Sequence, residues 1–152
     1  MGDPFSIVSG VFGLSAIAVK VIISLSGYVD SVRGAKAEVQ ALSVEISTVH
    51  AVLGELKIQI DEYPDAEAKL ATESKSAVKR VLEHCEITLL GLGRMVDKAQ
   101  AVVTESGMER MVKTVRWKFK DGEVKRFKEM LKEDKGNLQI VMQILSRYVS
   151  FL

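Results

Sequence analysis

Hydrophobic and small residues run almost without interruption through the first part of the chain. Between Phe5 and Val29 the only ionisable side chain is Lys20. As an α-helix, this stretch would be roughly 38 Å long, which is enough to cross a hydrocarbon core of about 30 Å. An Asp-Pro pair suits the start of such a helix, and a glycine at position 34 suits its end. The pattern therefore predicts a helix over residues 4–31.

Three further segments have hydrophobic residues at every third or fourth position, which is the spacing of an amphipathic helix. The second predicted helix has the apolar positions Val39, Leu42, Ile46, Val49, Leu53, Leu56 and Ile60. The third is predicted from about residue 66 or 72 to residue 103, although Gly91 and Gly93 weaken it. In the last segment, Asp121-Gly122 is a turn signal and Asp134 falls where an apolar residue is due. We expect a short helix over residues 108–120 and a longer one after Gly122.

These elements predict an all-α fold. It is a helical bundle of four long helices plus a short extra helix, with the apolar N-terminal helix central. A length of 152 residues suits a single domain over residues 1–152. Two prolines, and 6% aromatic against 47% hydrophobic residues, favour helices over a sheet sandwich. The single cysteine, Cys85, cannot form an intramolecular disulfide and fits a reducing cytosol.

The sequence gives little support for catalysis. His50 and His84 have no metal-ligand spacing with Cys85, and His84 and Cys85 point about 100° apart as helical neighbours. Cys85 lies in an apolar seam, where a structural thiol is expected. The Gly-Leu-Gly-Arg sequence at 91–94 lacks the frame of a phosphate-binding loop. We therefore predict that the protein is not an enzyme and has no cofactor or metal.

The predicted N-terminal helix has two kinds of surface. A stripe of small or polar residues, here called the small-residue stripe, comprises Ser6, Gly10, Gly13, Ala16, Lys20, Ser24 and Gly27. The other faces are apolar, and the candidate membrane-inserting residues there are Phe5, Ile7, Val8, Val11, Phe12, Leu14, Ile17, Val19, Val21 and Ile22, followed by Ile23, Leu25 and Tyr28. In lipid, small residues let helices approach closely or line a wet interior. The other interpretation is a core helix whose stripe accommodates its neighbours while Lys20 reaches solvent.

A basic segment lies near the C-terminal helix. Residues 110–128 contain two acidic and eight basic residues, interleaved with Trp117 and Phe119. The basic residues, here called the basic patch, are Arg110, Lys113, Arg116, Lys118, Lys120, Lys125, Arg126 and Lys128. Such a patch would dock anionic lipid headgroups or a partner, or it is a solvated helix face. Nucleic acid is not expected, because the patch is short and the net charge of the chain is +1.

Seven short stretches of the chain resemble the sequence of a known domain family. They are DPFSIVSGVFGL at 3–14, YV at 28–29, VRGA at 32–35, EVQAL at 38–42, VLGEL at 52–56, VRWKF at 115–119 and KGNL at 135–138. Together they resemble the fungal N-terminal domain of STAND (NOD-like receptor) proteins, the HeLo-like group, over essentially the whole chain. The resemblance implies a helical bundle related to the HeLo domain and to the four-helix domain of the mixed-lineage kinase-like pseudokinase.

The resemblance also implies a function in programmed cell death, of the kind that takes place in innate immunity and in heterokaryon incompatibility. Activated domains would cluster, release the N-terminal helix and permeabilise the plasma membrane. The implied partners are other copies of the chain, anionic membrane lipids, and an upstream NOD-like receptor or amyloid-motif signalling partner. The expected location is cytoplasmic at rest and the plasma membrane when activated.

Two other function classes remain open at this point. One is a homotypic protein-interaction or signalling module of a NOD-like receptor, with no lipid activity. The other is a carrier of lipid or of a small ligand, which would need a cavity between the helices.

Overall fold

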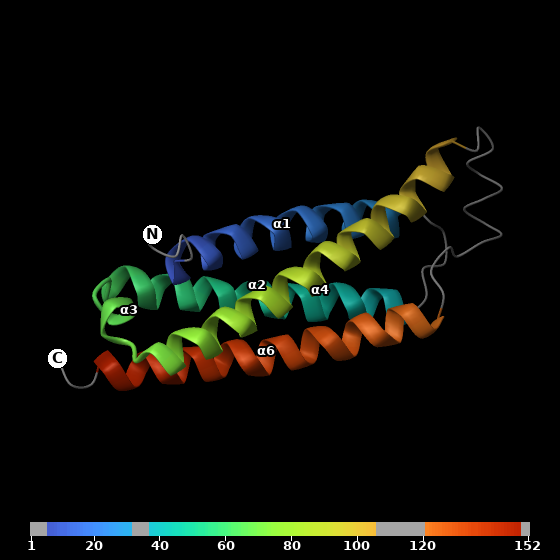
Figure 1. Cartoon of the computed structure of the whole chain (residues 1–152). Coiled ribbons are helices and arrows are strands. Elements are labelled where there is room, and N and C mark those ends of the chain that lie inside the picture. The colour runs from blue at the N-terminus through green and yellow to red at the C-terminus, as the bar shows by residue number, and fades with distance from the viewer. Residues whose placement is uncertain (1–5, 32–36, 106–120, 150–152) are drawn as a thin grey trace, which may run out of the picture.

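A computed structural model describes residues 6–31, 37–105 and 121–149. Within these ranges the chain forms four long helices and one short helix. They are α1 (Ile7–Ser31), α2 (Ala37–Glu62), α3 (Ala66–Lys69), α4 (Thr72–Glu105) and α6 (Asp121–Val149) (Figure 1). The predicted all-α bundle of four long helices is confirmed. The short helix predicted over residues 108–120 lies outside the described residues.

The four long helices occupy the corners of a square. α1 packs against α2 and α4, and α6 packs against the same two helices from the opposite side. α1 and α6 hardly touch, so they lie on one diagonal of the bundle. The N-terminus of α1, the short α3 and the end of α6 lie at the same end of the bundle (Figure 1).

The expectation that the N-terminal helix is central is wrong. Only one stripe of α1 is buried; its apolar members are Ile7, Val11, Leu14, Ala18, Val21, Leu25 and Tyr28, and Ser15 is buried beside them. These positions follow the three-then-four spacing of a helix that packs along a single seam. A square of four helices has no place that is enclosed on all sides, so the rest of this apolar helix faces outward.

The other three long helices bury the seams that their spacing predicts. All seven predicted apolar positions of α2, from Val39 to Ile60, lie in the core. α4 contributes Val78, Cys85, Leu89, Leu92, Val96 and Ala99, with Val81 partly buried beside Leu82. α6 contributes Val124, Phe127, Leu131, Leu138, Val141 and Leu145. The core is therefore a set of facing heptad-like seams.

Three residues that look like helix-weakening irregularities have positions in this packing. α6 continues through Asp134, whose side chain is only 1% exposed inside the seam. A Cβ atom on Gly91 would lie 3.3 Å from the Phe127 ring, and one on Gly93 would lie 3.3 Å from Cγ2 of Val21. The two glycines of α4 thus allow close approach to α6 and to α1 respectively.

Candidate membrane-interacting surface of the N-terminal helix

α1 has the length and composition of a membrane-spanning helix. Within the described ranges, Ile7–Asp30 is the one stretch that is long and apolar enough to cross a bilayer, with a mean hydropathy of 2.1. Core helices of soluble proteins and signal sequences share these two properties. A core helix is mostly buried, however, whereas only 33% of the most apolar part of α1 is buried.

The candidate membrane-inserting residues differ in how far they are exposed. Ile7, Val11, Leu14 and Val21 are buried, and Val8, Ile17 and Ile22 are partly buried; Phe12 and Val19 are exposed. Ile23 is the most exposed of the large apolar side chains of α1, at 66%. Phe5 lies outside the described residues. An outward apolar surface of Phe12, Val19 and Ile23, here called the outer apolar face, therefore exists while the helix is still packed.

The small-residue stripe lies beside the outer apolar face. Gly13, Ala16, Lys20 and Gly27 are exposed, and Ser6, Gly10 and Ser24 are partly buried. Among the described residues, a Cβ atom on Gly13 would have no neighbouring atom within 4 Å, and one on Gly27 would meet the Gln100 side chain at 3.5 Å. These two glycines are therefore not required for packing within the described bundle.

Polar contacts hold α1 near both of its ends. The backbone N–H of Ile7 donates to Oε2 of Glu67 on α3, with an N···O distance of 3.1 Å. Near the other end, Nε2 of Gln100 on α4 donates to the carbonyl of Ser24 at 2.9 Å. The Glu67 carboxylate also complements the positive end of the α1 helix dipole. On the outer surface, Nζ of Lys57 on α2 lies 4.5 Å from the centre of the Phe12 ring and partly covers it.

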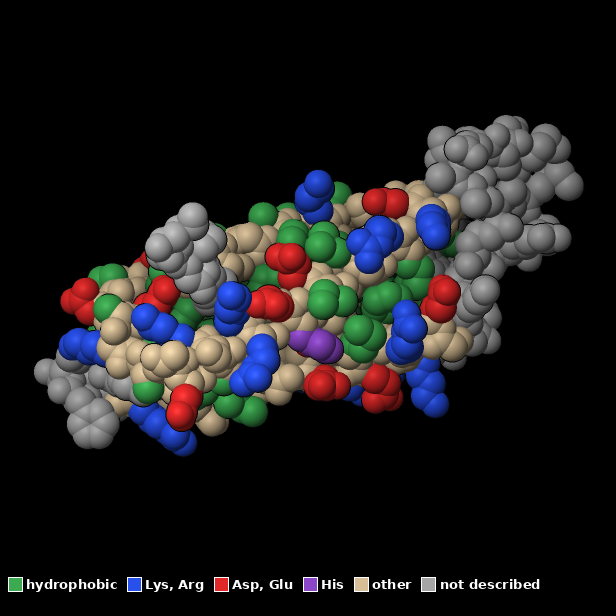
Figure 2. Space-filling view, in the orientation of Figure 1, with side chains coloured by type: hydrophobic (Ala, Val, Ile, Leu, Met, Phe, Trp, Pro, Cys, Tyr) green, Lys and Arg blue, Asp and Glu red, His purple; other side chains and the backbone are tan. Residues whose placement is uncertain are grey.

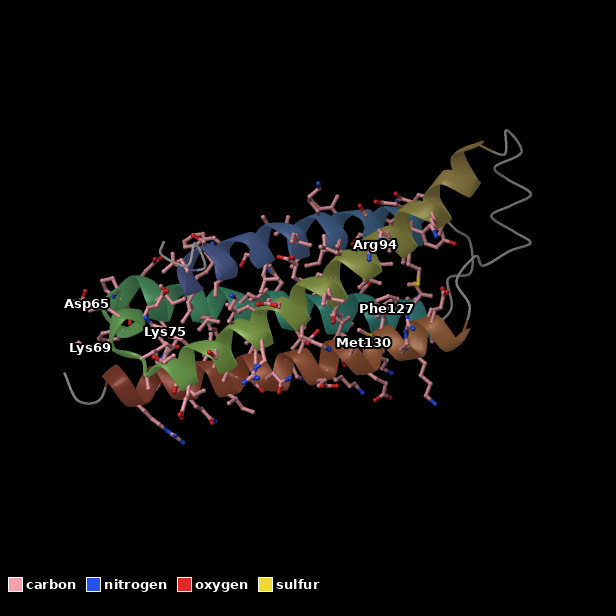
Figure 3. The ribbon with its side chains drawn as sticks, in the orientation of Figure 1. Asp65, Lys69, Lys75, Arg94, Phe127 and Met130 are labelled. Carbon is pink, nitrogen blue, oxygen red and sulfur yellow. The ribbon has the colours of Figure 1, made fainter. Side chains whose placement is uncertain are left out.

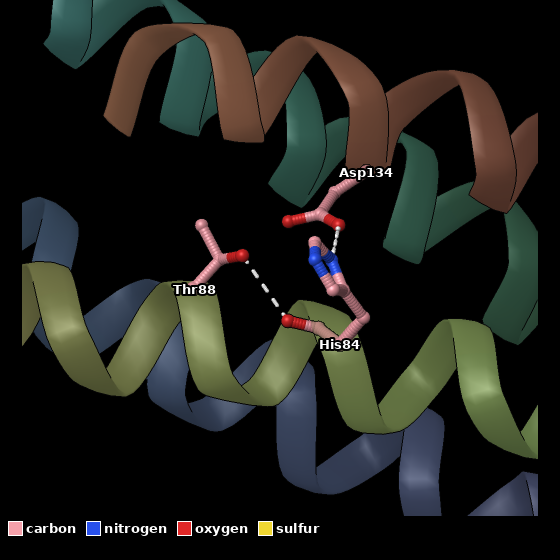
Figure 4. A network of polar contacts seen from close by, with 3 residues as sticks. All are labelled: His84, Thr88 and Asp134. Carbon is pink, nitrogen blue, oxygen red and sulfur yellow. Dashed lines mark hydrogen bonds and ion pairs between the residues drawn. The ribbon is translucent and has the colours of Figure 1, made fainter. Parts of the chain in front are cut away.

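Among the described residues, one histidine–carboxylate contact joins α4 to α6. Nδ1 of His84 lies 2.7 Å from Oδ1 of Asp134, and the hydroxyl of Thr88 donates to the His84 carbonyl at 3.1 Å (Figure 4). Among the described residues, the second oxygen of Asp134 has no hydrogen-bond partner. Burial, and secondarily the charge of Asp134, raise the pKa of the Cys85 thiol to about 12. Cys85 is thus protonated near neutral pH.

The sequence did not reveal this contact, because His84 and Asp134 are 50 positions apart. The one available signal was the aspartate at an apolar position of the α6 seam. Among the described residues, no group of three or more His, Cys, Asp and Glu side chains is arranged to hold a metal ion.

Only part of the basic patch lies in the described residues. Lys125 and Arg126 are exposed on the first turns of α6, and Lys128 is partly buried. The Arg126 guanidinium lies 5.3 Å from the centre of the Phe127 ring. The other five members of the patch, and Trp117, fall outside the described ranges. Figure 2 shows acidic and basic side chains interspersed over one face, with apolar side chains exposed between them.

These features define an all-α protein: a four-helix bundle whose N-terminal helix carries an outward apolar surface. Residues 2–147 match the family described as "Pigment biosynthesis cluster protein PigL N-terminal", a fungal family, and the chain belongs to it. Neither a curated protein nor a solved structure matches the chain. Membership of this family is compatible with the resemblance to HeLo-like domains, which stays a prediction.

Proposed function

We propose that this protein is a HeLo-like, membrane-targeting and oligomerising cell-death domain that permeabilises the plasma membrane through its N-terminal helix. The observation that supports the proposal best is the outer apolar face of α1. Phe12, Val19 and Ile23 are exposed on the helix that has the hydropathy and length of a membrane span. A long helix with two-thirds of its most apolar part unburied has a surface for lipid before any rearrangement.

Transfer of α1 from the bundle to a bilayer has opposing terms. Its buried seam exchanges one apolar environment for another, so those burial contributions largely cancel. Moving the outer apolar face from water into lipid makes the transfer free energy more favourable. Ile23 is 66% exposed, and burying the rest of its side chain contributes about 1–2 kcal/mol to that free energy. Two kinds of contribution oppose the transfer: the polar contacts that hold α1 in the bundle, among them those of Ile7 and Ser24, and the exposure of the seams of α2 and α4 that α1 uncovers. Small changes in these terms therefore shift the balance.

The uncovered seams account for oligomerisation in this proposal. Once α1 leaves, the apolar seams of α2 and α4 that faced it are exposed to water, and association of several domains covers them again. In the bilayer, the small-residue stripe lets neighbouring α1 helices approach closely, and Lys20 faces the assembly or reaches the headgroups. Clustering by an upstream receptor or by an amyloid-motif partner raises the local concentration and favours this state.

The first test replaces exposed isoleucines, because these variants leave the core intact. Ile23→Glu places a charge on the outer apolar face, whereas Ile58→Glu on α2 and Ile140→Glu on α6 change side chains of similar exposure, 60% and 52%. A charged side chain near the bilayer centre costs about 2.5–3.5 kcal/mol. We expect Ile23→Glu to reduce dye release from anionic liposomes by about a hundredfold, and the other two variants to release dye like the unmodified protein. Equal release by all three variants contradicts the proposal.

A second test locks α1 in place. Because a Cβ atom on Gly93 would lie 3.3 Å from Cγ2 of Val21, cysteines at these two positions are close enough for a disulfide. In a Cys85→Ala background, the oxidised Val21→Cys/Gly93→Cys protein should bind liposomes without releasing dye, and reduction should restore release. The Val21→Cys single variant is the control for the oxidant. Release that continues in the locked protein would show that α1 does not leave the bundle.

The second candidate is a homotypic interaction module without lipid activity. The observation in its favour is that Gly13 and Ala16 lie beside the outer apolar face, where a helix of another copy would pack closely. This function predicts dimers in solution that Ile23→Glu dissociates, with no dye release by any variant. Size-exclusion chromatography with and without liposomes separates the two functions.

A further inference from the structure

A groove of about 230 Å³ lies between α1 and α4. Its floor is apolar, with Ile17 and Val21 from α1 and Leu89 from α4. Three charged side chains line it as well: Lys20 from α1, and Arg94 and Asp97 from α4. Figure 3 shows Arg94 on α4 where this helix passes α1. The groove thus combines an apolar floor with charged groups, which is the composition of a small-molecule site.

Small residues on both helices make this space. Ser24 of α1 and Gly93 of α4 line the groove, and neither has a side chain large enough to fill it. Gly93 also brings α4 close to Val21, so the groove is open toward solvent but closed at its base. The role of these small residues in the resting bundle is therefore to leave room at one flank of α1.

The charges lining the groove are available to a ligand. Lys20, Arg94 and Asp97 are exposed and form no ion pair within the described residues. Two cations and one carboxylate give a local charge of +1, which favours a ligand with one negative charge. The volume lies below the 300 Å³ typical of the smallest sites for drug-sized ligands. It suits a headgroup and the first few carbons of a chain.

We propose that the groove between α1 and α4 binds a single-chain anionic amphiphile in monomeric form, such as an alkyl phosphate or a fatty acid. Lys20 and Arg94 bind the anionic oxygens of the head from the two helices, and Asp97 accepts a hydrogen bond from the remaining hydroxyl of a singly ionised phosphate head. The first part of the chain lies on Ile17, Val21 and Leu89, and the exposed Leu90 covers its exit.

Such a ligand would join α1 to α4 through its headgroup. Because it binds only while both helices are in place, it stabilises the packed position of α1 by mass action. In combination with the proposed membrane function, on which this consequence rests, the ligand would inhibit the release of α1. The binding itself does not depend on that function.

The test measures binding of octyl phosphate, below its micellar concentration, by titration calorimetry and by NMR shifts of the backbone amides in α1 and α4. Inorganic phosphate tests the head alone, octyl glucoside the chain alone, and octyltrimethylammonium the opposite charge. We expect octyl phosphate to bind at least about tenfold more tightly than each of these three. Equal affinity for octyl glucoside or for inorganic phosphate would overturn the proposal.

Variants locate the site. Lys20→Gln and Arg94→Gln should each weaken octyl phosphate binding by about tenfold, and Ser24→Leu should abolish it by filling the groove. Arg80→Gln is the matched control, because it removes an exposed arginine from the same helix about 21 Å away. Binding that responds to Arg80→Gln as strongly as to Arg94→Gln would place the ligand elsewhere. The octyl phosphate measurements contain no membrane, so their result does not depend on dye release. A variant that loses octyl phosphate binding but still releases dye from liposomes would leave the proposed membrane function intact.

Discussion

The contact between Gly93 and α1 allows a quantitative prediction. An alanine at this position adds a Cβ atom 3.3 Å from Cγ2 of Val21, which is shorter than the 3.5–4.0 Å that is optimal for two carbon atoms. Replacing glycine by alanine inside a helix stabilises it by about 0.8–1.0 kcal/mol. At Gly93 the crowding of Val21 should offset most of this gain, so Gly93→Ala should leave the free energy of unfolding nearly unchanged.

Two other helical glycines supply the controls. In the described part of the chain, a Cβ atom on Gly54 in α2 or on Gly136 in α6 would have no neighbouring atom within 4 Å, so alanine there gains helix stability without crowding. Gly54→Ala and Gly136→Ala should each stabilise the protein by about 1 kcal/mol, a rise of about 2–4 °C in Tm. A leucine at 93 overpacks the same contact and should cost about 1–3 kcal/mol.

The assay is urea denaturation followed by circular dichroism, together with amide hydrogen exchange. The exchange data should show that Gly93→Leu lowers protection mainly in α1, because this substitution pushes α1 away from α4. If Gly93→Ala stabilises the protein as much as Gly136→Ala, the two helices are not in close contact at this position. The explanation of the glycine, and the geometry of the groove beside it, would then be wrong.

Three further perturbations have defined outcomes. Glu67→Ala removes the carboxylate that accepts the hydrogen bond of the Ile7 N–H, so it should lower the free energy of unfolding by about 1–2 kcal/mol and increase dye release. The control is Glu62→Ala at the exposed end of α2, which should change the free energy of unfolding by less than about 0.5 kcal/mol. His84→Ala leaves the Asp134 carboxylate buried without its partner, so the free energy of unfolding, measured by urea denaturation at pH 7, should fall by about 1–3 kcal/mol. Adding Asp134→Leu removes the buried carboxylate and should restore the lost stability. The folded-state pKa of Cys85 is raised from 9.0 to about 12, so its contribution to stability is complete below pH 9 and is lost as the pH rises toward 12. Between these values the unmodified protein should lose up to about 1.4 kcal/mol per pH unit more than Cys85→Ala, and parallel curves would contradict the raised pKa.

The sequence predicted most of the fold because each long helix repeats its apolar positions regularly. The seven apolar positions of α2 all lie in the core, and α6 begins at the predicted turn signal. The position of α1 could not be predicted in the same way. An almost uniformly apolar helix does not show which of its sides is buried, so burial along Ile7, Val11 and Leu14 appears only when α2 and α4 are in place.

The candidate sites depend still more on contacts between distant parts of the chain. Lys20 and Arg94 line one groove although 74 positions separate them in the sequence, and no local pattern connects them. Glu67 reaches the first turn of α1 from a helix of four residues, too short to be separated from the start of the third predicted helix. Helix periodicity identifies the residues on one seam, whereas pairing across seams follows from the packing of the helices.

The two proposed states of α1, packed in the bundle and bound to the membrane, depend on different faces of this helix. The seam from Ile7 to Tyr28 packs this helix into the bundle. In the proposed membrane function, the outer apolar face on the opposite side would be the first part to meet lipid. Under this proposal we expect a change on the outer apolar face to alter membrane binding without weakening the resting bundle. We expect a change at Gly93 or Glu67 to alter the release of α1 without changing the surface that lipid would contact. If both classes of variant changed liposome binding and dye release in the same proportion, one face would govern both steps, and the separation between docking and release would have to be abandoned.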